Sequence, residues 1–115
     1  MDRRSLRYPP TRPVVLIVEG HDENRAMYAI TLSASGFDVV AVKDGGEAWG
    51  RALQIQPDII VADLSMPHHG GRQFLENLKQ NPRTRDIPIV AKPSSTDELA
   101  AVLRRVLDRH AHVRQ

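Results

Sequence analysis

Four short apolar runs, each followed by a segment with helical spacing, constrain the fold of this 115-residue chain more than any other feature. The runs consist almost entirely of valine, isoleucine, leucine and alanine, which is typical of strands covered on both faces of a parallel sheet. They predict strands at residues 14–18, 38–42, 58–62 and 87–91. Strands that alternate with helices in this way specify an α/β fold, with a parallel sheet, right-handed crossovers and helices on both faces.

The helical segments carry signals of different strength. In the last segment, Ser95 and Glu98 are spaced as a capping box, and a helical stripe of apolar residues follows. That stripe consists of Leu99, Val102, Leu103, Val106 and Leu107. Asp44 is the predicted N-cap of the second helical segment. In the first segment, the spacing predicts a buried face made of Ala26, Met27, Ile30 and Ala34.

Length and charge favour one domain with tails. A chain of 115 residues, 41% of them hydrophobic, is long enough for one core and too short for two. We expect an ordered domain over residues 14–110, a basic tail rich in proline and arginine at 1–13, and a short tail at 111–115. The first tail carries a formal charge of +3 and the whole chain +2, so the remainder is near neutral. This balance does not indicate a dedicated nucleic-acid-binding surface.

The sequence also bounds the cellular setting. Without cysteine, the chain can form neither a disulfide nor a thiolate metal site. No apolar run approaches the roughly 18 residues of a membrane span, and no apolar stretch follows the N-terminal arginines. We therefore expect a cytoplasmic protein without a membrane partner.

Three of the charged residues that follow the predicted strands are candidate site residues. Glu19 follows the first strand, Asp63 the third, and Lys92 the fourth. In parallel α/β sheets, functional groups gather beyond the carboxyl ends of the strands. Carboxylates at such an edge can bind a hard divalent cation, and a nearby ammonium can neutralise charge that is added to one of them.

Several motifs give this pattern a family resemblance, which extends over about residues 14–107. They are "VLIVEG", "DENRAMY", "PDIIVADLSMPHHGG", "DIPIV" and "AKP". Together they resemble the receiver domain of two-component response regulators, a flavodoxin-like fold. The resemblance implies that Asp63 accepts a phosphoryl group from a histidine kinase or phosphotransfer protein, and that Lys92 contacts the phosphoryl oxygens. It also implies a Mg²⁺ ion held by Glu19, Asp63 and the backbone carbonyl of Ser65. Such a module is a regulatory phosphoacceptor, not an enzyme.

The chain departs from the family pattern in two places. Gly20 stands where the family has a second acid, which weakens the expected Mg²⁺ site. In addition, receivers have a further helix and strand before the Lys-Pro pair. Such a unit needs at least about ten residues of crossover and a strand of about five, and the run "IPIVAKP" at 87–93 has no room for it. We therefore expect a truncated receiver with four strands in spatial order 2-1-3-4 instead of five.

The missing strand has a consequence for assembly. It leaves the strand at 87–91 as an apolar edge of the sheet, and such an edge invites pairing with another chain. We expect a homodimer that forms through this edge or by exchange of the last helix.

Three other interpretations stay open. The chain could be a phosphorylation-independent pseudo-receiver that serves as an interaction and dimerisation module, which Gly20 favours. His21, His68 and His69 could hold Zn²⁺ or Ni²⁺ together with Asp63. Finally, the arginines near both ends could contact phosphates in a basic-tailed nucleic-acid-binding protein.

Overall fold

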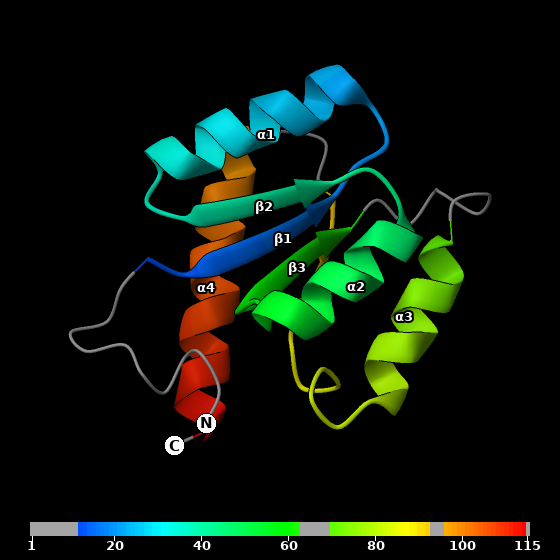
Figure 1. Cartoon of the computed structure of the whole chain (residues 1–115). Helices are drawn as coiled ribbons and strands as arrows, with labels where there is room; N and C mark the ends of the chain where they lie inside the picture. The colour runs from blue at the N-terminus through cyan, green and yellow to red at the C-terminus, as the bar shows by residue number, and fades with distance from the viewer. Residues whose placement is uncertain (1–11, 63–69, 93–95, 115) are drawn as a thin grey trace.

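A computed structural model describes residues 12–62, 70–92 and 96–114. Within these ranges the chain forms a parallel sheet with the strand order β2-β1-β3-β4, as predicted (Figure 1). The strands are β1 (Val14–Val18), β2 (Asp38–Val42), β3 (Ile59–Ala62) and β4 (Ile89–Ala91). The helices are α1 (Asp22–Ala34), α2 (Gly45–Ile55), α3 (Gly71–Gln80) and α4 (Thr96–Arg114).

The helices form a layer on each face of the sheet. Successive side chains of a strand point to opposite faces, so β1 contributes to two cores. Leu16 and Val18 pack with buried residues of α2 and α3, whereas Val15 and Ile17 pack with buried residues of α1 and α4. In Figure 1, α2 and α3 accordingly lie in front of the sheet and α4 lies behind it.

Burial differs between the central and the outer strands. Every residue of β1 and β3 is buried, in agreement with their continuous apolar sequences. The outer strands β2 and β4 are partly exposed, since each has a neighbour on only one side. The apolar runs therefore identified the strands correctly. The order of the strands in the sheet decides which of them are central and which are outer.

Two of the predicted helix signals are confirmed. The Asp44 carboxylate accepts a hydrogen bond of 2.9 Å from the backbone N–H of Glu47, as an N-cap of α2 should. In α4, Leu99 and Leu103 are fully buried, and Val106 and Leu107 pack against the same core. Ser95 lies outside the described residues, so the capping box of α4 stays a prediction.

The buried face predicted for α1 is wrong. All four residues expected there are exposed: Ala26, Met27, Ile30 and Ala34. Met27 is 54% exposed and Ile30 72%. The helix instead buries Tyr28 and Leu32, which join Phe37 in the core. Both sets of positions fit a helical period, and the set with the larger side chains faces the sheet.

The ends of some elements also differ from the predicted ranges. Arg12 is bound to the fold, because it donates a hydrogen bond of 2.7 Å to the Phe37 carbonyl and pairs with Asp38 at 3.3 Å. Residues 1–11 of the predicted tail lie outside the described residues. At the other end, α4 continues to Arg114, beyond the expected boundary at residue 110.

The chain passes from β4 to α4 with no room for a further helix and strand. Only residues 93–95, which are outside the described ranges, separate Lys92 from the first residue of α4. This connection agrees with the predicted loss of one helix–strand unit. None of the helices in the described ranges is long and apolar enough to cross a membrane.

Candidate functional site

The carboxyl ends of the four parallel strands bring Glu19 and Lys92 to the same edge of the sheet. The backbone N–H of Glu19 donates to the Val42 carbonyl at 2.9 Å, which extends the pairing of β1 with β2 by one residue. The backbone N–H of Lys92 donates to the Ala62 carbonyl at 3.1 Å and extends the pairing of β4 with β3. Both side chains therefore start from backbone positions that the sheet fixes.

Glu19 and Lys92 form a buried ion pair. The Lys92 ammonium nitrogen lies 2.7 Å from Oε1 of Glu19. The Glu19 side chain is only 1% exposed and that of Lys92 26%. The second carboxylate oxygen, Oε2, accepts a hydrogen bond of 3.0 Å from the backbone N–H of His21. Both oxygens of this buried carboxylate thus have donors, as a charge removed from water requires.

Tyr28 supports the lysine from the side of α1. Its ring centroid lies 5.8 Å from the Lys92 ammonium nitrogen, within the range of a cation–π contact. Tyr28 is not among the predicted site residues, because the helical spacing placed a different face of α1 in the core. The signal that could have identified it is its spacing of four residues from Leu32, which is also buried.

Arg25 holds the beginning of α1 against the end of β1. Its guanidinium donates to the backbone carbonyl of Glu19 at 3.1 Å and to the Asp22 carboxylate at 2.6 Å. These contacts span the short turn between β1 and α1. They fix the backbone on both sides of Gly20 and His21, next to the ion pair.

The other predicted site residues lie outside the described residues. Asp63 directly follows Ala62, the last residue of β3, and Ser65 is two positions further on. His68 and His69 fall in the same undescribed stretch. Among the residues that are described, no three acidic or histidine side chains gather in a way that could hold a metal ion. The predicted roles of Asp63 and Ser65 stay predictions.

The described residues do not fit a bound Mg²⁺ ion in this arrangement. Of the three predicted ligands, Glu19 is the one that the structure describes, and both its oxygens already accept hydrogen bonds. Gly20 brings no oxygen ligand from its side chain. A Mg²⁺ ion bound through Glu19 would therefore compete with the Lys92 ammonium and the His21 N–H for the carboxylate oxygens.

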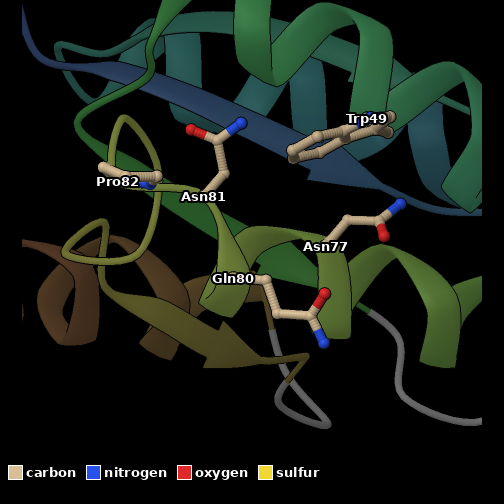
Figure 2. A pocket seen from close by; sticks show the side chains of 5 residues that line it. All are labelled: Trp49, Asn77, Gln80, Asn81 and Pro82. Atoms are coloured by element: carbon tan, nitrogen blue, oxygen red, sulfur yellow. The ribbon is translucent and has the colours of Figure 1, made fainter.

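A separate pocket lies between α2 and the end of α3. It has a volume of about 270 Å³ and is lined by Trp49, Asn77, Gln80, Asn81 and Pro82. Figure 2 shows the Trp49 ring projecting from α2 opposite the three amides. None of the five lining side chains is titratable, so this pocket offers stacking and hydrogen bonds but no acid–base chemistry.

Comparison with known sequences identifies one family. The response regulator receiver domain matches residues 15–112. The polar-differentiation response regulator DivK of Brucella anthropi is 31% identical over 77 residues, which cover 67% of this chain and 63% of DivK. The phosphate regulon transcriptional regulatory protein PhoB of Escherichia coli is 33% identical over 84 residues, or 73% of this chain and 37% of PhoB. The chain therefore spans less than two thirds of the length of either relative.

The fold is shared with solved structures. The chemotaxis response regulator CheY4 of Vibrio cholerae superposes with a TM-score of 0.76 at 25% identity, over 84% of this chain and 99% of CheY4. A sensor protein from Polaromonas sp. JS666 gives a TM-score of 0.77 at 22% identity, over 86% of this chain and 98% of that protein. These values agree with the flavodoxin-like fold that the family resemblance implied and with the observed strand order.

Proposed function

Because the chain belongs to the response regulator receiver domain family, we propose that it is a signalling module that accepts a phosphoryl group on Asp63. The proposed donor is a histidine kinase or a phosphotransfer protein in the cytoplasm. Receiver domains are regulatory phosphoacceptors and not classical enzymes. The output of this module would accordingly be a change in its protein contacts.

The observation that carries this proposal is the position of the Lys92 ammonium. Lys92 is hydrogen-bonded through its backbone to Ala62, the residue that precedes Asp63 in the sequence. In the proposed reaction, a carboxylate oxygen of Asp63 attacks phosphorus and the phosphorus–nitrogen bond of the phosphohistidine breaks. A lysine ammonium has three N–H donors, so its bond to Glu19 is compatible with donation to a phosphoryl oxygen. Its positive charge would offset the negative charge that the reaction adds.

Phosphoryl transfer from acetyl phosphate tests the proposal directly. The expected result is an intact mass increased by one phosphoryl group in the unaltered chain. Asp63→Asn should abolish this increase, because the amide is a poor nucleophile. Asp86→Asn is the matched control: this aspartate is exposed in the turn before β4, and its replacement should leave the modification unchanged. A modification that persists in Asp63→Asn would refute the assignment.

One observation favours a second function, that of a phosphorylation-independent interaction module. The Glu19 carboxylate accepts a hydrogen bond on each oxygen, and its neighbour Gly20 has no acid group. A receiver that no longer accepts a phosphoryl group would retain the fold and act by binding other proteins. Absence of any mass increase with acetyl phosphate, in a chain shown to be folded, would favour this function.

We also propose that the module forms a homodimer. The outer edge of β4 pairs with no strand in the described part of the chain, and unpaired backbone groups there can pair with a second copy. Exchange of α4 is the alternative route. The edge is favoured here, since Leu99 and Leu103 of α4 are buried against the strands of their own chain.

Nothing in the described residues favours the nucleic-acid-binding alternative. The Arg104 guanidinium lies 4.7 Å from the Phe37 ring centroid and also donates to the Ser35 carbonyl. This arginine therefore stabilises the contact between α4 and the end of α1. The arginines of the basic tail before residue 12 are outside the described ranges.

A further inference from the structure

We propose that the Lys92 ammonium is the built-in cation of Glu19, so that the unphosphorylated module does not bind Mg²⁺. The positive charge of this lysine replaces that of the divalent ion which binds in family members with two acids. The inference rests on the proposed function, because it names the cation that acts at the same site. It differs from the expectation that Glu19 is a metal ligand.

Each oxygen of Glu19 already has a donor with which a metal ion would have to compete. Oε1 accepts from the Lys92 ammonium at 2.7 Å, and Oε2 accepts from the His21 backbone N–H at 3.0 Å. With the side chain only 1% exposed, Glu19 has little freedom to turn towards a new ligand. A Mg²⁺ ion bound to Glu19 would lie close to the ammonium, where the two positive charges repel.

The Glu19–Lys92 pair offers no net negative charge to a divalent ion. Glu19 and Lys92 cancel, and Gly20 contributes nothing. An acid in place of Gly20 would add one negative charge beside the pair. Hard divalent cations are bound by several oxygen ligands whose charge count sets the affinity. Gly20 and Lys92 thus both act against metal binding.

Lys92 is also held in place before any ligand arrives. Its backbone N–H is bonded to Ala62 in the sheet, and its ammonium lies 5.8 Å from the Tyr28 ring centroid. A preorganised group makes its contact with little further loss of conformational entropy. A dissolved ion must instead give up its own waters and freedom of movement. The tethered ammonium therefore has an advantage over Mg²⁺ in competing for Glu19.

Titration of the full unphosphorylated chain with MgCl₂ at constant ionic strength tests the inference. The backbone amides of His21 and Lys92 are the reporters in ¹⁵N–¹H spectra, since both lie at the ion pair. We expect no saturable shift in the unaltered chain up to tens of millimolar Mg²⁺. A saturable shift of both amides at low millimolar Mg²⁺ would overturn the inference.

Restoring the second acid supplies the complementary test. Gly20 is exposed and its backbone is not in the left-handed region, so a non-glycine residue adopts this conformation without backbone strain. Gly20→Asp should bind Mg²⁺ at least about ten-fold more tightly than the unaltered chain, because it adds a charged ligand. Gly20→Asn has nearly the same shape without the charge and should behave like the unaltered chain. Equal Mg²⁺ affinity in the two variants would contradict the electrostatic explanation.

A comparison of acetyl phosphate reactions with Mg²⁺ and with EDTA separates this inference from the proposed function. Modification of Asp63 to the same extent in both supports the inference. Modification that EDTA abolishes, together with a saturable Mg²⁺ shift, overturns the inference and leaves the phosphoacceptor function intact. If neither reaction modifies the chain, the proposed function fails, and the Mg²⁺ titration still decides the inference.

Discussion

At the scale of single residues, Glu19 illustrates what a buried charge requires from the rest of the chain. A carboxylate that is 1% exposed has lost its hydration and must find donors within the protein. Glu19 finds one donor two residues away, in the His21 backbone, and another 73 positions away, in Lys92. The pair therefore couples the end of β1 to the end of β4.

Removal of the lysine charge should destabilise the fold. Lys92→Met keeps the apolar stem near Tyr28 but leaves the Glu19 carboxylate buried without its ammonium. We expect a loss of about 3 kcal/mol in the free energy of unfolding, measured by urea denaturation. Adding Glu19→Gln should recover most of this loss, because the second change removes the unpaired charge. A double variant no more stable than Lys92→Met would contradict this explanation.

Thr84 is the other buried polar residue in the part of the chain whose burial is described, and its role is structural. Its hydroxyl donates to the Leu78 carbonyl at 2.9 Å and satisfies a backbone acceptor at the end of α3. Thr84→Val preserves the shape and should cost about 1 kcal/mol of folding free energy, because that bond is lost. Thr84→Ser retains the hydroxyl and should be less affected in the same thermal melts. Equal or greater stability of Thr84→Val would show that the bond contributes nothing.

At the scale of elements, the beginnings of α2 and α3 approach each other unusually closely. Gly45, the first residue of α2, is buried against Gly70 and Gly71. A Cβ atom at Gly45 would lie 3.1 Å from the backbone nitrogen of Gly71 and would collide with the Gly70 carbonyl. Since these are backbone atoms, they cannot turn aside as a flexible side chain would.

A methyl group at Gly45 should therefore be costly. We expect Gly45→Ala to lower the free energy of unfolding by about 2 kcal/mol, because α2 and α3 must move apart. Gly50→Ala, in the same helix, is the matched control, since no atom lies within 4 Å of its added Cβ. That variant should gain about 0.5–1 kcal/mol from helix propensity. If both variants melt at the same temperature, the close approach is not limiting.

The first helix shows why periodicity alone can select the wrong face. Met27 and Ile30 and the alternative pair Tyr28 and Leu32 both recur at helical spacing, so the sequence supports two stripes. Tyr28 and Leu32 face the sheet, where they pack with Phe37, a residue that follows the helix. In α4 the apolar residues form one broad stripe, and there the predicted face is correct.

At the scale of the whole molecule, the loss of one helix–strand unit turns β4 into an outer strand. The Pro88 carbonyl and the Lys92 N–H both bond to β3. Because the direction of hydrogen bonding alternates along a strand, the N–H of Ala91 points away from β3. No strand pairs with that side of β4 in the described ranges. A strand of a second copy can therefore pair with it.

The proposed dimer should be sensitive to this backbone group. Ala91→Pro removes an outward-facing N–H, a change that an edge strand tolerates. It should weaken dimerisation at least about ten-fold, because the bond is lost once in each copy. Light scattering over a concentration series measures this, with Ala91→Val as the control that keeps the N–H. An unchanged dimer in Ala91→Pro would exclude the edge and favour exchange of α4, and monomer at all concentrations would exclude both.

The sequence by itself determined the elements, their order and the edge at which the charged residues meet. These features follow from local patterns: apolar runs, the cap at Asp44, and the parallel direction that the alternation of strands and helices imposes. The short run "IPIVAKP" also predicted the missing unit, because its length left no room for one.

Only the tertiary structure decided which groups pair. The bond between Lys92 and Glu19, the burial of Tyr28 and the close approach at Gly45 depend on residues that are distant in the chain. A residue's own sequence neighbours do not specify such contacts, since these arise when the sheet and helices bury their apolar faces together. Residue identities predicted a functional carboxylate at position 19, and only the packing showed that it pairs with Lys92.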